Sequence, residues 1–148
     1  MNDSDNTKVD AATVAEDRSI FALLEAAHAL EAKVEDALER AGLSSPKYSV
    51  LSALVAAPTP LSLSELAGEL SCVRSNMTQL VDRLEADGLV RRVHCPEDRR
   101  LVRAEITQEG KTRQANGAAE IAQLHRDFAA KVEVDDRAAL ARLLSALS

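Results

Sequence analysis

The stretch from Ser62 to Gly88 contains start and stop signals for two successive helices with only a short turn between them. Ser62 and Glu65 form a capping box, in which each side chain satisfies a backbone N–H group at a helix start. An amphipathic segment follows a turn at 71–73, and Gly88 stands where helices commonly end in the left-handed conformation. A short helix, a tight turn and a second helix follow each other in a helix-turn-helix. This order restricts the possible folds more than any other feature of the chain.

The second of these helices has one apolar and one polar face. Its apolar residues recur at the spacing of one face of an α-helix: Met77, Leu80, Val81 and Leu84. The opposite face carries hydrogen-bonding and basic side chains: Arg74, Ser75, Asn76, Thr78, Gln79, Asp82 and Arg83. Readout of DNA in the major groove needs a helix whose outer face offers donors and acceptors to base edges. For this helix alone, a solvated polar face is the commoner alternative.

After Gly88 the pattern changes to two short strands, 89–93 and 101–106, so that a β-hairpin is expected. Arg99 at its tip is expected to enter a minor groove, where negative potential attracts arginine. Three further arginines are expected to contact phosphates: Arg91, Arg92 and Arg103. The alternative is a charged surface hairpin, because Glu97 and Asp98 neutralise part of the charge.

The net charge of −6 argues at first against a nucleic-acid partner. The distribution of charge changes this view, because residues 91–103 contain five arginines against Glu97 and Asp98, a local surplus of three. The Debye length is ~8 Å at physiological ionic strength, so that distant acids are largely screened from this region. DNA binding therefore remains open.

Composition favours a helical protein. Aromatic residues make up only 2% of the chain and tryptophan is absent, whereas a β-sandwich or barrel usually contains more aromatic and β-branched residues. The expected fold is mainly α with a small β-hairpin. No apolar run approaches the ~18 residues of a membrane span. The start Met1–Asp10 is polar and acidic, unlike a signal peptide, so that a cytoplasmic protein without a membrane partner is expected.

Helical periodicity also flanks the central region. One amphipathic helix is expected from Ile20 to its stop at Gly42. Ser45 is expected to cap the next helix, with Pro46 at its first position. Thr107 and Asp135 are expected to cap the last two helices.

The central region resembles the MarR family of bacterial transcription regulators. The residues that carry the resemblance are Leu66-Ala67, LVDRLEADGLV at 80–90, PEDRR at 96–100 and ITQEG at 106–110. The resemblance is strong over residues 45–113, and the flanking helices agree with those of the family in order and length. The combination of motifs is specific, whereas a lone helix-turn-helix would not be.

The resemblance implies a winged helix-turn-helix within an obligate homodimer. The helices of 16–44 and 107–148 would form the dimerisation region, and 45–106 would bind DNA. Residues 1–15 are polar and lack periodicity, so that they are expected to fray. The second helix of the motif would lie in the major groove, and the wing from Asp98 to Arg100 would reach the minor groove.

The resemblance also gives individual residues a role and shows two departures. Asp98 would brace the wing by pairing with an arginine, and Arg99 and Arg100 would contact DNA. Val73 stands at the helix start where the family usually has Ser or Thr. Gln79 stands where a basic residue is common.

The function that we expect is a homodimeric DNA-binding repressor, released by a small-molecule effector. Its operator would be a pseudo-palindrome with half-sites ~10 bp apart. Tyr48 lies close to where such dimers carry an effector pocket, although plain core packing explains this residue as well. The alternative function is a winged-helix module that binds a partner protein and not DNA.

The two cysteines allow a third function, a thiol-based redox-sensing regulator. Cys95 follows His94 in the loop between the strands and is expected to be exposed, whereas Cys72 is most simply a buried apolar residue. A zinc site from Cys72, His94 and Cys95 would lack paired ligand spacing, so that no metal and no cofactor are expected. No glycine-rich phosphate loop or nucleophile arrangement indicates an enzyme.

Overall fold

The computed structural model describes residues 19–71, 74–95, 98 and 101–146. The chain divides into two compact units, residues 1–33 and 34–148. Every described residue of the first unit from Ile20 onward is exposed and helical. Within the described residues, no helix combines the length and the apolar character needed to cross a membrane.

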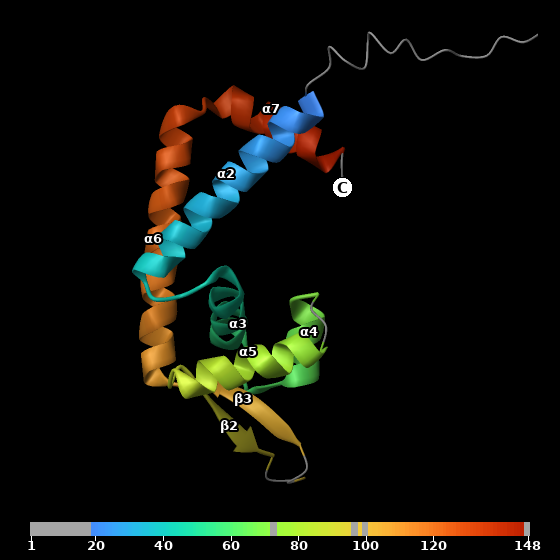
Figure 1. Cartoon of the computed structure of the whole chain (residues 1–148), viewed down its shortest axis with the longest axis vertical. Helices are drawn as coiled ribbons and strands as arrows, with labels where there is room; N and C mark the ends of the chain where they lie inside the picture. The colour runs from blue at the N-terminus through green and yellow to red at the C-terminus, as the bar shows by residue number, and fades with distance from the viewer. Residues whose placement is uncertain (1–18, 72–73, 96–97, 99–100, 147–148) are drawn as a thin grey trace, which may run out of the picture. The chain divides into compact units, whose positions relative to one another are not determined.

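Helices make up most of the described chain, with one small sheet (Figure 1). The elements are α2 (Ser19–Arg40), α3 (Ser45–Ala56), β1 (Leu61–Ser62), α4 (Leu63–Glu69), α5 (Arg74–Ala86), β2 (Val90–His94), β3 (Val102–Ile106), α6 (Gln108–Lys131) and α7 (Val134–Ser145). The mainly α fold with a helix-turn-helix and a β-hairpin is thereby confirmed.

The sheet contains one strand that the sequence pattern did not predict. β2 and β3 form the expected antiparallel hairpin, in which Arg92 stands opposite Ala104. The two-residue strand β1 pairs with the other edge of β3, and Leu61 stands opposite Ala104. A strand of two residues is too short for alternation to be visible in a sequence.

The core of the second unit lies between the helices and one face of this sheet. The apolar face of α5 contributes Met77, Val81 and Leu84, none of which is exposed. They pack in one cluster with Leu51 of α3 and Leu66 of α4. The predicted amphipathicity of α5 is therefore confirmed, and its polar face is left to solvent.

Helix starts agree with the expectations at some positions and differ at two. The capping box of Ser62 is present, and the Thr107 hydroxyl accepts a hydrogen bond from the backbone N–H of Gly110. The prediction of Ser45 as a cap was wrong, because Ser44 is the N-cap and the Ser45 N–H donates to the carboxylate of Glu35 at 3.1 Å.

The prediction for the last helix was also wrong. Asp135 lies in the first turn of α7, and Glu133 occupies the N-cap position without a side-chain hydrogen bond. A carboxylate in the first turn still interacts favourably with the helix dipole. Sequence signals identify the turn in which a helix starts better than the residue that caps it.

The end of α5, the start of β2 and the start of α6 meet at one junction. The Thr107 hydroxyl donates to the backbone oxygen of Gly88 at 2.8 Å. The Thr107 N–H donates to the backbone oxygen of Leu89 at 3.1 Å. Gly42 and Gly88 adopt positive φ angles of 68° and 73°, as their predicted positions after helix ends require.

Candidate nucleic-acid interface

The outer face of α5 presents five of the residues that were predicted to contact DNA. All five side chains are exposed: Ser75, Asn76, Thr78, Gln79 and Arg83. Among the described residues, Arg83 forms no ion pair, so that its guanidinium is available to a ligand. The Arg74 side chain and Val73 lie outside what the structure describes.

The start of helix α4, before the turn, is stabilised by both hydrogen bonds of its capping box. The Ser62 N–H donates to the Glu65 carboxylate at 2.7 Å, and the Glu65 N–H donates to the Ser62 hydroxyl at 3.2 Å. These hydrogen bonds, together with Arg103, hold the pKa of Glu65 below its ordinary value. The Arg103 guanidinium donates both to Glu65 at 3.0 Å and to the backbone oxygen of Pro60 at 2.9 Å.

The arginines of the hairpin differ in how many ion pairs they form within the protein and in how exposed they remain. Arg91 forms an ion pair across the hairpin with Glu105 at 2.5 Å and remains exposed. Arg92 is half-buried and pairs with two carboxylates of α5, Asp82 and Glu85. Arg92 and Arg103 thus join the two strands of the hairpin to the two helices of the motif.

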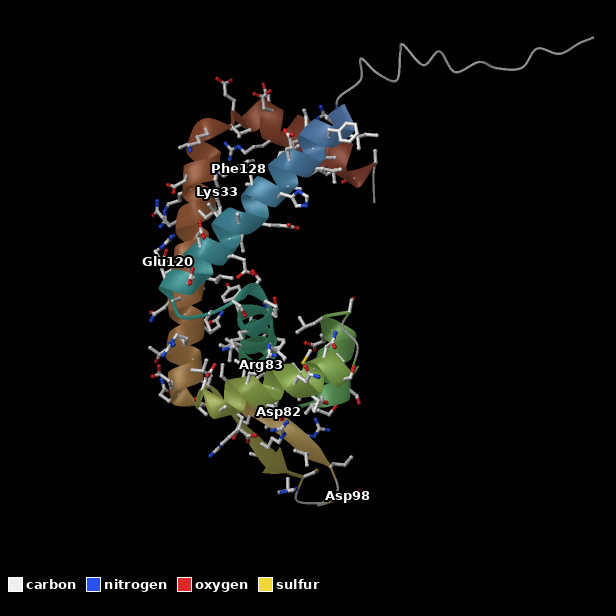
Figure 2. The ribbon with its side chains drawn as sticks, in the orientation of Figure 1. Lys33, Asp82, Arg83, Asp98, Glu120 and Phe128 are labelled. Atoms are coloured by element: carbon white, nitrogen blue, oxygen red, sulfur yellow. The ribbon has the colours of Figure 1, made fainter. Side chains whose placement is uncertain are left out.

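The far end of the hairpin is described only at Asp98, which lies in the loop beyond β2 and β3 (Figure 2). Its backbone oxygen accepts a hydrogen bond from the Leu101 N–H at 3.0 Å. Arg99 and Arg100 lie outside the described residues, so that the brace between Asp98 and an arginine and the minor-groove contacts stay predictions.

Of the two cysteines, only Cys95 belongs to the part of the chain that the structure describes. The prediction that Cys95 is exposed was wrong, because its side chain is half-buried in the loop where its N–H donates to the Leu101 oxygen at 3.0 Å, whereas Cys72 lies outside the described residues. Within the described parts of the chain, no three His, Cys, Asp or Glu side chains are grouped as metal ligands would be.

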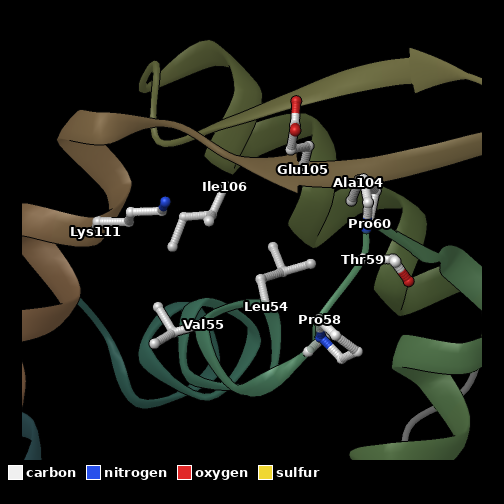
Figure 3. Close-up of a pocket in the computed structure, with 10 residues that line it drawn as sticks. Leu54, Val55, Pro58, Thr59, Pro60, Ala104, Glu105, Ile106 and Lys111 are labelled. Atoms are coloured by element: carbon white, nitrogen blue, oxygen red, sulfur yellow. The ribbon is translucent and has the colours of Figure 1, made fainter.

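A cavity of about 380 Å³ lies between the end of α3, β3 and the start of α6 (Figure 3). Its walls include Leu54, Val55, Pro58 and Ile106, and Lys111 extends from α6 toward Ile106. Tyr48, the residue considered for an effector pocket, is half-buried and packs against Gly117 of α6. Neither this cavity nor the pairing of Arg92 was predicted from the sequence, although the spacing of Asp82 and Glu85 puts both on one side of a helix.

Comparisons with known proteins agree with this architecture. Residues 43–102 match the model of the MarR family. The chain is 41% identical over 73 residues to the HTH-type transcriptional repressor YetL of Bacillus subtilis, which covers 49% of this chain and 44% of that protein. The chain thus spans less than half the length of that curated relative.

Solved structures cover more of the chain. The transcriptional repressor CouR bound to a 23-mer DNA duplex is 28% identical, with a TM-score of 0.74 over 86% of this chain and 89% of that one. CouR from Rhodococcus jostii RHA1 bound to p-coumaroyl-CoA is 25% identical, with a TM-score of 0.70 over 88% and 92%. The winged helix-turn-helix fold is therefore confirmed.

Proposed function

Because residues 43–102 match the model of the MarR family, we propose that the chain is a transcription regulator of this family that binds double-stranded DNA through α5 and the hairpin. The observation that carries the proposal is the amphipathic α5, whose apolar face is buried at Met77, Val81 and Leu84 while its hydrogen-bonding face is exposed. A helix presented in this way matches the geometry of major-groove readout. The complex of a similar protein with a 23-mer DNA duplex supports a DNA partner.

The contacts are divided between bases and backbone. Asn76 and Gln79 carry amides suited to adenine edges, and Ser75 and Thr78 can bond either base type. Arg74 and Arg83 are assigned to phosphate or guanine, and Arg99 and Arg100 to the minor groove. Arg91 is assigned to phosphate, and its pairing with Glu105 weakens that contact.

The proposed protein is a homodimer that represses from a pseudo-palindromic operator with half-sites ~10 bp apart. The helices of 16–44 and 107–148 form the proposed dimerisation region, and residues 45–106 the DNA-binding region. A regulator of chromosomal DNA works in the cytoplasm. The proposal includes no catalytic activity.

DNA binding is tested by fluorescence anisotropy with the region upstream of the protein's own gene. Asn76→Ala should relax base specificity by ~1–3 kcal/mol at one position, and Arg83→Ala should weaken binding and lower its salt dependence. The matched controls are Asn116→Ala and Arg126→Ala on exposed positions of α6, outside the proposed DNA-binding region, which should leave base specificity and salt dependence as in the wild type. Absence of binding at low salt would favour the module that binds a partner protein instead.

Release by a small molecule is the second part of the proposal. The cavity beside Lys111 combines apolar walls with a cationic amine, which suits a small carboxylate with an apolar body. Such compounds should raise the melting temperature of the wild type and of the control Lys131→Met, but not of Lys111→Met. An equal rise in all three proteins would place the ligand elsewhere, for instance beside Tyr48.

The redox alternative predicts a different response. Peroxide would weaken DNA binding by the wild type and not by Cys95→Ser. An unchanged response in Cys95→Ser excludes this cysteine as the sensor.

A further inference from the structure

Two carboxylates of α5 meet one arginine of β2 on the side of the helix that faces the hairpin. Asp82 and Glu85 both accept hydrogen bonds from the Arg92 guanidinium, on its two terminal nitrogens. Glu85 also accepts the backbone N–H of Arg92 at 3.0 Å. The strand is therefore joined to the helix through the main chain as well as through the side chain.

We propose that Arg92 is a positioning residue that fixes the wing relative to the DNA-reading helix, and that it does not contact DNA itself. Here the wing is the hairpin of β2, β3 and their loop. The proposal deepens the proposed function and rests on it, because it concerns how α5 and the wing reach the same duplex.

The surroundings of Arg92 are unsuited to a phosphate contact. Its side chain is only 27% exposed, compared with 66% for Arg91. Two carboxylates against one guanidinium leave a net local charge of −1, which repels a phosphate. The hydrogen bond to Asp82 is the main cause of the raised pKa of Arg92, consistent with a cation held by acidic partners.

The position of Arg92 allows it to control the whole wing. It lies in the middle of β2, and each residue of β2 is paired with a residue of β3. A strand that is fixed at this point also fixes β3, its paired strand, relative to α5. Ordering the wing before binding lowers the entropic cost of contacting two grooves at once.

Salt dependence separates a positioning role from a phosphate contact. Loss of one phosphate contact lowers the slope of log affinity against log salt by about one unit. Arg83→Ala should show this change. Arg92→Ala should instead lower affinity at least tenfold at each salt concentration and leave the slope as in the wild type.

Removing the acidic partners gives a second test with an opposite sign. The double variant Asp82→Ala/Glu85→Ala removes two negative charges near DNA and frees Arg92. If Arg92 were a phosphate contact, operator binding would strengthen and its salt slope would steepen. The positioning role predicts weaker operator binding. The single variant Asp82→Ala, at an exposed side chain, provides the same test if the double variant does not fold.

Hydrogen exchange without DNA keeps the inference separate from the proposed function. Amides of Val90–His94 should exchange faster in Arg92→Ala, while those of the middle of α6 keep their protection. If the wild type binds no DNA, the proposed function fails, whereas unchanged exchange in β2 overturns the positioning role. A salt slope lowered by one unit in Arg92→Ala would also overturn it.

Discussion

At Gly110, α6 lies against the backbone at the start of the hairpin. A Cβ atom at this position would lie 2.1 Å from the backbone oxygen of Leu89 and 2.8 Å from a side-chain carbon of Ile106. Because the first contact is with backbone, a rotamer change cannot relieve it. We expect Gly110→Ala to lower the free energy of unfolding by at least ~1–3 kcal/mol, measured by urea denaturation.

Gly68 provides the matched control for this substitution. It lies in α4, and a Cβ atom there would meet nothing within 4 Å. Gly68→Ala should raise stability by up to ~1 kcal/mol, because alanine is the better helix former. Equal effects of the two substitutions would contradict the close approach at Gly110.

Individual residues were predictable where their signal is local. Gly42 and Gly88 follow helix ends, and their roles are visible from neighbouring residues. The need for Gly110 comes from Leu89, which is distant in sequence, so that no local pattern reveals it. Arg92 was assigned to phosphate because a cluster of arginines does not indicate which of them meet carboxylates in the folded chain.

At the scale of elements, the start of α4 has a pH-dependent stability. The pKa of Glu65 is lowered from its ordinary value of 4.5, chiefly by the hydrogen bond from the Ser62 backbone. A lowered pKa means that the carboxylate stabilises the folded state fully above pH 4.5. This contribution to stability disappears as the pH falls through the lowered pKa that Glu65 has in the folded chain. Glu65→Gln should therefore be less stable than the wild type at pH 7, and the difference should vanish in acid.

The measurement is the free energy of unfolding as a function of pH for the wild type and Glu65→Gln. Glutamine still accepts the hydrogen bond of a capping box, so that the variant isolates the charge. Glu69→Gln removes an exposed carboxylate from the end of the same helix and should not reproduce the effect. A constant difference between wild type and Glu65→Gln at all pH values would contradict the role of ionisation.

Elements were predicted in the correct order because helix caps, periodicity and the hairpin pattern are local signals. The capping box at Ser62 and the cap at Thr107 are present as expected. β1 was missed because it exists only through its pairing with β3. The DNA contacts predicted for the wing's outer loop are those of Arg99 and Arg100. Both residues lie outside the described residues, so that this part of the site stays a prediction.

At the scale of the whole molecule, α7 has no buried residue within the described chain. None of the described residues of this 12-residue helix is buried, and Leu143 is 66% exposed. Isolated helices of this length are marginal in water, and an apolar face needs burial to stabilise them. A second copy of the chain would bury it, as the proposed homodimer requires. We expect Leu143→Asp to shift the protein from dimer to monomer in sedimentation equilibrium.

Leu101→Asp is the matched control, since Leu101 is also an exposed leucine but lies in the wing. It should remain dimeric, and a dimeric Leu143→Asp would contradict the role of α7.

The consequence for DNA follows from the symmetry of the operator. A dimer places one α5 in each half-site, so that binding of the second helix becomes intramolecular and raises affinity by orders of magnitude. Leu143→Asp should therefore lose most of its affinity for a duplex with two half-sites. It should retain that of the wild type for a single half-site, because each α5 and its wing are unchanged.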